Sequence, residues 1–272
     1  MKPTKEELAA QLTIEDFPRS NSYDPEWMLK NMMGPNVVWL TEALTQVTQL
    51  QAGTRVMDLG CGKAMSSVFM AREFQLEVWA TDLWISASEN WQRIREAGMQ
   101  QRVFPIHAEA HALPFAHDFF DALICVDAYH YFGTDDLYLE YITQFVRPGG
   151  TLAIIVPGVI QEFDGAVPAH LSTYWRWDWH SFHSPAWWRY HWEKMGLVEV
   201  TYADTLPNGW KHWLRWLEIC QRAGFPYPEG YPSPQDEIEM LRVDAGRTLG
   251  FTRLVARKKY SQSFNTDVLY LI

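Results

Sequence analysis

Two glycines and an acidic residue in the first third of the chain have the spacing of a nucleoside-binding site. Gly60 and Gly62 follow a mainly apolar segment that reads as a strand. Glycines at such a point let the backbone turn sharply and approach a ligand, and the helix that follows presents free N–H groups. Asp82 ends the next apolar segment, 22 positions after Gly60. A carboxylate there can accept both hydroxyls of a ribose.

An alternation of apolar and helical segments must position these residues. Strands are expected at 55–60, 77–82, 102–106, 119–127, 151–157, 197–204 and 251–256. Between the first five, helices are expected at 67–74, 87–97 and 135–146, the last behind Thr134 as its N-cap, with a turn at Arg147–Gly150. Because parallel strands need crossover helices, the sequence predicts a doubly wound, mostly parallel, seven-stranded α/β sheet.

The flanking segments are expected to be helical or lid-like. Residues 1–53 read as a helical preface, with Asn36 as an N-cap. Residues 54–260 would form the main domain and 261–272 a tail. Insertions are expected at about 158–195 and 205–248; they hold a helix capped by Ser184, a helix at 209–223, the proline-rich loop 225–234 and a short helix opened by Ser233-Pro234.

Five segments, in this order, resemble the class I S-adenosylmethionine-dependent methyltransferases, especially the small-molecule branch that includes the ubiquinone-biosynthesis enzymes. The segments are DLGCGKA (58–64), Asp82, AEAHALPF (108–115), FDALICVDAYHYF (120–132) and the PGG turn. The chain departs from the family pattern in Lys63-Ala64, where Thr-Gly is usual, and in Glu109, where Asp is common.

The resemblance implies a set of cofactor contacts for S-adenosylmethionine and its product S-adenosylhomocysteine. The glycine loop would hold the methionine part, Asp82 the ribose, Leu83 the adenine face, and Glu109 or the Ala110 backbone the adenine edge. Tyr23 would reach over the cofactor. The complete implied set is Tyr23, Asp58, Gly60, Cys61, Gly62, Lys63, Asp82, Leu83, Glu109, Ala110 and Asp127.

Methyl transfer from a sulfonium is an in-line displacement, so the protein must align the acceptor and supply a base if the acceptor carries a proton. Candidates follow the fourth strand: Asp127, Tyr129, His130 and Tyr131. An unperturbed imidazole titrates near pH 6.5, so His130 could take that proton, or it could be hydrogen-bonded under a loop.

Nine of the 14 tryptophans lie between positions 175 and 216. Trp188 and Trp192 are spaced i, i+4 and so share a helix face. Trp175, Trp188, Trp192 and Trp210 are the candidates for binding the acceptor, either as an aromatic cage for an amine or by stacking on a flat ring. The alternatives are core packing, a lid, or the surface of a homodimer.

Composition narrows the classes of partner. Lys and Arg number 23 against 33 Asp and Glu, a net charge of −10 that disfavours nucleic acid. Three separated cysteines and the lack of a signal peptide or apolar span predict a cytoplasmic location and no membrane. The histidines at 170, 180 and 183 lack cysteines or an HExxH motif nearby, so no metal is expected.

Two other functions remain open on the sequence. The first is a non-catalytic S-adenosylmethionine-binding module with an aromatic surface for a partner. The second is an NAD-dependent oxidoreductase, which the missing third glycine of GxGxxG, where Met65 stands, and the position of Asp58 disfavour.

Overall fold

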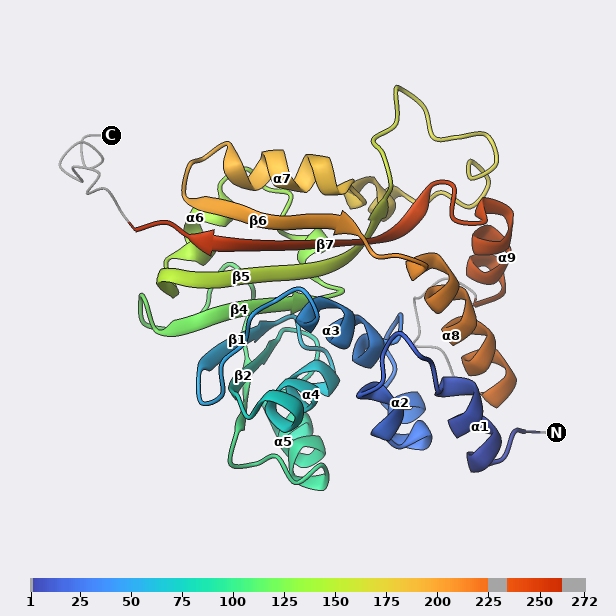
Figure 1. The fold of residues 1–272 in the computed structure, drawn as a ribbon, viewed down its shortest axis with the longest axis horizontal. Helices are drawn as coiled ribbons and strands as arrows, with labels where there is room; N and C mark the ends of the chain where they lie inside the picture. Colours follow the sequence, from blue (N-terminus) through green and yellow to red (C-terminus); the bar gives the residue numbers. More distant parts are fainter. Residues whose placement is uncertain (1, 225–233, 261–272) are drawn as a thin grey trace.

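The computed structural model describes residues 2–224 and 234–260, and a seven-stranded sheet forms its centre (Figure 1). The sheet order is β3-β2-β1-β4-β5-β7-β6. Strands β1 to β5 pair in parallel, and β7 is antiparallel to both β5 and β6. This confirms the predicted doubly wound, mostly parallel sheet. The strands are β1 (Arg55–Leu59), β2 (Glu77–Asp82), β3 (Val103–His107), β4 (Phe120–Val126), β5 (Val146–Val159), β6 (Val198–Thr205) and β7 (Leu249–Lys258).

Helices cover both faces of the sheet. Successive side chains of a strand point to opposite faces, so both faces of this sheet present apolar side chains that must be buried. In β4, Ala122, Ile124 and Val126 join one apolar cluster, whereas Leu123 and Cys125 join the other. The first cluster includes residues of α1–α5, α8 and α9, and the second residues of α6 and α7. The helices are α1 (Lys5–Leu12), α2 (Pro25–Lys30), α3 (Val37–Thr45), α4 (Met65–Phe74), α5 (Ala87–Glu96), α6 (Tyr138–Thr143), α7 (Pro185–Glu193), α8 (Gly209–Ala223) and α9 (Pro234–Asp244), with short 3₁₀ turns η1 (Ser20–Ser22), η2 (Tyr129–Tyr131) and η3 (Trp177–Ser181).

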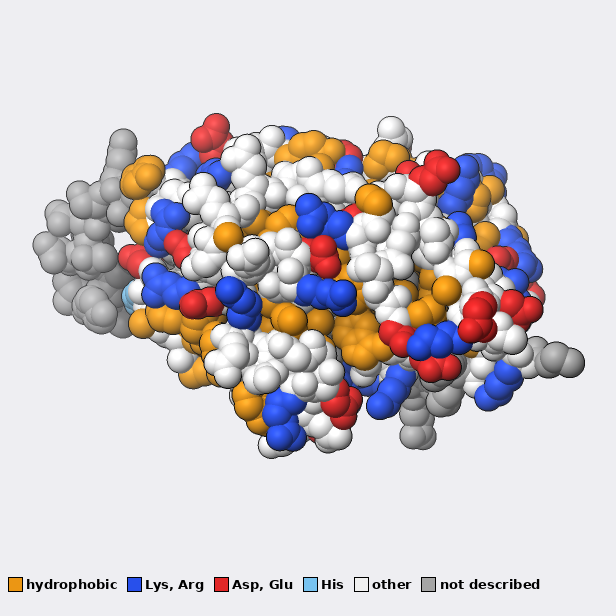
Figure 2. Space-filling view, turned by 60° about the horizontal axis from the view of Figure 1, so that its bottom comes forward, with side chains coloured by type: hydrophobic (Ala, Val, Ile, Leu, Met, Phe, Trp, Pro, Cys, Tyr) orange, Lys and Arg blue, Asp and Glu red, His pale blue; other side chains and the backbone are white. Residues whose placement is uncertain are grey.

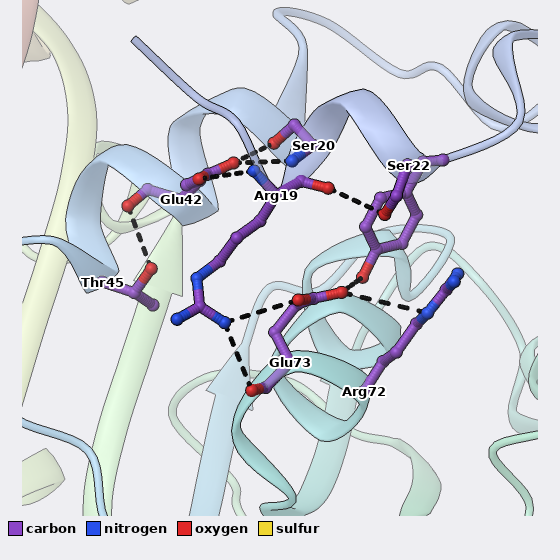
Figure 3. A network of polar contacts seen from close by, with 8 residues as sticks. Arg19, Ser20, Ser22, Glu42, Thr45, Arg72 and Glu73 are labelled. Atoms are coloured by element: carbon purple, nitrogen blue, oxygen red, sulfur yellow. Dashed lines mark hydrogen bonds and ion pairs between the residues drawn. The ribbon is translucent and has the colours of Figure 1, made fainter. Parts of the chain in front are cut away.

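A polar network holds the N-terminal segment together and joins it to α4 of the main fold (Figure 3). The carboxylate of Glu42 on α3 accepts hydrogen bonds from the backbone N–H groups of Arg19 and Ser20 and from the Ser20 hydroxyl, at 3.0, 2.7 and 2.6 Å. The Arg19 guanidinium also reaches Glu73 on α4. The bonds to Glu42 lie within the preface, and the contact with Glu73 joins the preface to α4. Residues of the segment 31–37 line the cavity at the carboxyl ends of the strands.

The local signals at most helix ends are confirmed. Asn36 caps α3, where its side chain accepts from the N–H groups of Val38 and Trp39 at 3.1 Å. Ser184 caps α7, with Pro185 in the first turn. Helix α4 begins at Met65, two residues before the expected start.

Two expectations after β4 are wrong. The helix expected at 135–146 covers only Tyr138–Thr143, because the chain first makes a turn in which the Asp135 carboxylate accepts from the Leu137 N–H at 2.7 Å; Thr134 caps nothing. The turn at Arg147–Gly150 lies within β5 as an irregularity, where the pairing steps from Phe120–Val146 to Ala122–Thr151.

Part of the predicted organisation lies outside the described residues: Ser233, the rest of the proline-rich loop at 225–232, and the tail 261–272. Within the described ranges, no helix is both long enough and apolar enough to cross a bilayer.

Candidate functional site

A cavity of about 770 Å³ opens at the carboxyl ends of β1, β2 and β4. Open α/β sheets bind ligands at this edge, and the volume lies within the range of small-molecule sites. Its walls come from the loops after β1, β2 and β4, from residues 31–37, from 176–182, and from one residue each of α8 and α9. The sheet therefore supplies the floor, and the preface and the two insertions supply the remaining walls.

The loop after β1 has no room for side chains at its glycines. Gly60 has φ +71°, and a Cβ there would stand 2.4 Å from the Cβ of Ala128. Gly62 has φ +53°, and its Cβ would stand 2.9 Å from the Met33 sulfur. Both positions require glycine, because the left-handed backbone and the close approach of neighbouring atoms exclude a side chain. The loop therefore presents bare backbone to the cavity.

The Asp82 side chain links the loop after β1 to the loop after β2. One carboxylate oxygen accepts the Gly62 N–H at 2.8 Å, and the other accepts the N–H groups of Trp84 and Ile85 at 2.7 and 2.9 Å. A carboxylate has about four acceptor positions, so one remains for a ligand hydroxyl. Asp82 lines the cavity and thus serves loop geometry as well as the ribose contact expected of it.

Asp58 does not line the cavity, so its predicted direct contact with the cofactor is wrong. Its fully buried carboxylate accepts the hydroxyls of Ser66 and Ser67 at 2.6 and 2.5 Å. Burial raises the pKa of Asp58 to about 6 in spite of these bonds. Asp58 instead fastens the first turn of α4, whose N-cap residue, Ala64, makes no capping hydrogen bond with its side chain.

The other residues assigned to the cofactor line the cavity, except Tyr23. Leu83 is 48% exposed there, and Glu109 lies beside it with both oxygens on His111, at 2.8 Å from its N–H and from its Nδ1. Hydrogen bonding by His111 lowers the pKa of Glu109. Cys61, Lys63, Ala110 and Asp127 complete this group.

Tyr23 lies elsewhere, so the expectation that it covers the cofactor is wrong. Its ring packs between Trp27 and Phe69, and its hydroxyl donates to Glu73 at 3.1 Å. Residues that the sequence analysis did not select, Met33 and Gly34 among them, line the cavity from the preface.

Asp127 lines the cavity and has an unusual backbone conformation. Its φ is +58°, held by an N–H bond to the Ile155 carbonyl at 2.8 Å. No hydrogen bond or ion pair joins its carboxyl group to another described residue. Burial, and next the charge of Glu237, raise the pKa of Asp127 to about 8.

Glu237 was missed by the sequence analysis. It lies on α9, 110 residues beyond Asp127, and lines the same cavity. Burial raises its pKa to about 7 against the opposing effect of Arg176. No motif surrounds it, and only the i, i+3 and i+4 pattern of α9, with Ile238 and Leu241 in the core, indicates which face turns inward.

His130 lines the cavity but does not titrate as expected. It is 2% exposed, and burial lowers its pKa to about 3. The imidazole is therefore neutral at pH 7, and it makes no hydrogen bond to another described residue. The Tyr131 ring lies beside it, tilted by 39° with 4.0 Å between ring centroids, and is 53% exposed.

Tyr129 lies on the opposite face of the sheet, so its predicted catalytic role is wrong. It is fully buried against Trp188 and Trp192, with ring centroids 5.7 and 5.5 Å away. Strand β4 ends just before it, and the turn of η2 sends Tyr129 and His130 to different sides.

None of the four tryptophans expected to bind the acceptor lines the cavity. Trp188 and Trp192 are fully buried in the second apolar cluster, Trp175 packs on the first, and Trp210 lies against Gly246. The core alternative is thus the right one for α7. The tryptophans that line the cavity are Trp84, Trp177, Trp179 and Trp213.

Among residues 2–224 and 234–260, no group of three or more His, Cys, Asp or Glu side chains is placed to hold a metal ion. The histidines considered for zinc instead pair with acids: His170 contacts Asp244 at 2.9 Å, and His183 contacts Glu162 at 3.1 Å.

The sequence matches a known domain family and curated enzymes. The methyltransferase domain family matches residues 56–150. The chain is 30% identical over 132 residues to Methyltransferase GfsG of Streptomyces halstedii, which is 47% of this chain and 48% of that protein. It is 32% identical over 145 residues to demethylmenaquinone methyltransferase of Listeria welshimeri, 47% and 58% of the two chains. The chain thus spans about half the length of these relatives.

Solved structures share the whole fold. The [4+2]-cyclase SpnF has a TM-score of 0.66 and 15% identity, with 96% of this chain and 98% of that chain covered. Phosphoethanolamine N-methyltransferase 2 of Haemonchus contortus, in complex with S-adenosyl-L-methionine, has a TM-score of 0.67 and 18% identity, with 91% and 61% covered.

The sheet order, the bare glycine loop, Asp82 and the family match agree with one another. They give no support to the NAD-dependent alternative, whose third glycine is absent here. Residues 56–150 therefore resemble a methyltransferase domain of the class I, S-adenosylmethionine-dependent type.

Proposed function

We propose that the chain transfers a methyl group from S-adenosylmethionine to a small-molecule acceptor by in-line displacement. The observation that carries this proposal is the single cavity that extends from the glycine loop, past Asp127, to a compartment walled by the inserted segments. An in-line displacement needs both reactants side by side in one space, and a continuous cavity provides that space.

The residues of the loops fit the cofactor. The loop 60–62, which has no side chain at Gly60 or Gly62, lines the cavity and accommodates the methionine part. The Lys63 ammonium donates to the Lys30 carbonyl at 3.4 Å and forms no ion pair with any residue that the structure describes, so it is available for a carboxylate. Asp82 retains an acceptor position for a ribose hydroxyl, and the exposed Leu83 offers an apolar face to a purine. When bound, the cofactor supplies an electrophilic methyl group.

The chain's own residues then orient and enclose the acceptor. Asp127 lies between the two ends of the cavity and is the group best placed to accept a proton, because its raised pKa lies near physiological pH. His130, neutral and without a hydrogen-bond partner among described residues, orients the acceptor rather than removing its proton. Phe182 and Trp179 exclude water.

The alternative of a non-catalytic binding module is not favoured, because Asp127 and the enclosed compartment have no use in a protein that only binds the nucleoside. The test is incubation with S-adenosylmethionine carrying a deuterated methyl group and a mixture of amines, phenols, thiols and carboxylic acids. We expect one class of product to gain the labelled methyl group by mass spectrometry. Binding of S-adenosylhomocysteine without any labelled product would support the binding module instead.

A further inference from the structure

The acceptor compartment carries an excess of acidic groups. Asp127, Asp178 and Glu237 line it, and Arg176 is the basic residue among them. The Arg176 guanidinium is already paired with Asp178 at 3.2 Å. Asp127 and Glu237 thus remain as two carboxyl groups without a hydrogen bond or ion pair to any described residue. Two such groups in an enclosed space are costly unless a cation or several donors join them.

Aromatic and polar side chains complete the compartment around this pair. Trp177, Trp179, Trp213 and Phe182 form its walls. The faces of such rings attract ammonium groups. His130 is an independent sign of a ligand, because a buried imidazole whose Nδ1 finds no hydrogen-bond partner among the described residues is rare. The neutral ring can accept a hydrogen bond from an N–H group.

From this juxtaposition we propose that the methyl acceptor is a small amine that enters as an ammonium ion and is held by Asp127 and Glu237 between aromatic rings. This inference rests on the proposed methyl transfer and names its substrate class. An acceptor with a carboxylate or phosphate at the reacting end is disfavoured, since it would be repelled by the ionised form of either carboxyl group and gains no opposite charge from them.

The two carboxyl groups have different tasks. The charge of the bound ammonium ion favours the ionised forms of both groups. Glu237 holds the positive charge, while the Asp127 carboxylate, which released its own proton to water as the amine entered, accepts one ammonium proton and leaves the nitrogen with a lone pair. The nitrogen forms a bond to the methyl carbon as the carbon–sulfur bond breaks, and that electron pair stays on sulfur as a neutral thioether. The product is a methylated ammonium ion, and the proton on Asp127 leaves to water when the product departs.

The test is calorimetric titration of the S-adenosylhomocysteine-loaded protein with matched probes: benzylamine, benzyl alcohol and benzoate, and the same series built on butylamine. We expect at least one amine to bind at millimolar concentration or better, about tenfold or more tighter than its alcohol, and benzoate and butyrate to bind least. Equal affinity for amine and alcohol, tighter binding of a carboxylate, or no saturable amine binding overturns the inference.

Substitutions test whether Asp127 and Glu237 cause the preference for amines. Glu237→Gln should lower the affinity for the amine about tenfold and leave that for the alcohol and for S-adenosylhomocysteine unchanged. Asp127→Asn, which alters the other carboxyl group of the pair, should also lower the affinity for the amine. Glu239→Gln, the same change on the exposed side of α9, is the control. An unchanged ratio of amine to alcohol affinity in both variants overturns the assignment, whereas failure to bind S-adenosylhomocysteine would refute the proposed function itself.

Discussion

Asp127 combines two features that are costly in a protein with no function for them. A non-glycine residue with positive φ is strained by about 1–2 kcal/mol, and an enclosed carboxyl group pays for desolvation. Such strain is found where surrounding structure holds a side chain in place for binding or catalysis. The proposed base is thus also the most constrained residue of the cavity.

The raised pKa of Asp127 predicts a dependence of stability on pH. The folded protein keeps a proton on Asp127 between about pH 4 and pH 8, where the unfolded chain has lost it. Stability must therefore fall as pH rises through this window, by up to about 1.4 kcal/mol per pH unit for this group. Thermal melts of ligand-free protein at pH 5 to 8 should show a smaller decline in Asp127→Asn than in the wild type. Parallel declines would show that Asp127 is ionised throughout.

Asp82 is predicted to affect both folding and the cofactor. Asp82→Ala leaves three backbone N–H groups without their acceptor and should lower the free energy of unfolding by about 2–4 kcal/mol. It should also weaken S-adenosylhomocysteine binding in calorimetry. Glu96→Gln, on the exposed side of α5, is the control. A folded Asp82→Ala protein with unchanged affinity would remove Asp82 from the site.

At the scale of elements, two neighbouring segments use tryptophan for different purposes. Helix α7 buries Trp192 completely, whereas η3 leaves Trp177 84% exposed at the cavity. Trp192→Ala should cost about 3–5 kcal/mol of stability in urea unfolding, because it empties a packed core site. Trp177→Ala should change stability by about 0.5 kcal/mol or less and weaken benzylamine binding. The reverse pattern would mean that α7 forms the acceptor site.

A substitution at the start of α4 is predicted to raise the stability of the protein. Ala64 has φ +60°, in the left-handed region where a side chain is unfavourable. Ala64→Gly should raise the free energy of unfolding by up to about 1 kcal/mol, part of the relief being offset by the flexibility of glycine in the unfolded chain. Ala71→Gly, inside the same helix, should lower it by about 1 kcal/mol or more. Loss of stability in both would show that Ala64 is unstrained.

The elements differ in how far the sequence determines them. The strand-and-glycine pattern around Gly60 and the cap at Asn36 are local, so both were predictable. The i, i+4 spacing of Trp188 and Trp192 shows that they share a helix face, but the same spacing suits a core face and a ligand face. Glu237 lines the same cavity as Asp127 because of the way α9 packs on the rest of the fold, and no local pattern in the sequence specifies that packing.

At the scale of the whole molecule, the acidic balance agrees with a small-molecule acceptor. The net charge is −10, and on the face in Figure 2 the Lys and Arg side chains are mixed with acidic and apolar ones. A continuous basic surface of the kind that binds a phosphate backbone is not present on that face.

The fold alone leaves the reaction open, since a [4+2]-cyclase shares it over nearly the whole chain. The proposed reaction depends on the site: the glycine loop, Asp82, and the acidic compartment at the same cavity. The central claim is therefore tested first at the cofactor.

The most direct measurement is calorimetric titration of the purified protein with S-adenosylhomocysteine, with NAD as the control ligand. The account predicts saturable, micromolar binding of S-adenosylhomocysteine and none of NAD. Gly60→Ala should abolish that binding, because its Cβ would collide with Ala128. Binding of NAD, or no binding of S-adenosylhomocysteine by the folded protein, would contradict the assignment of the loop and with it the proposed methyl transfer.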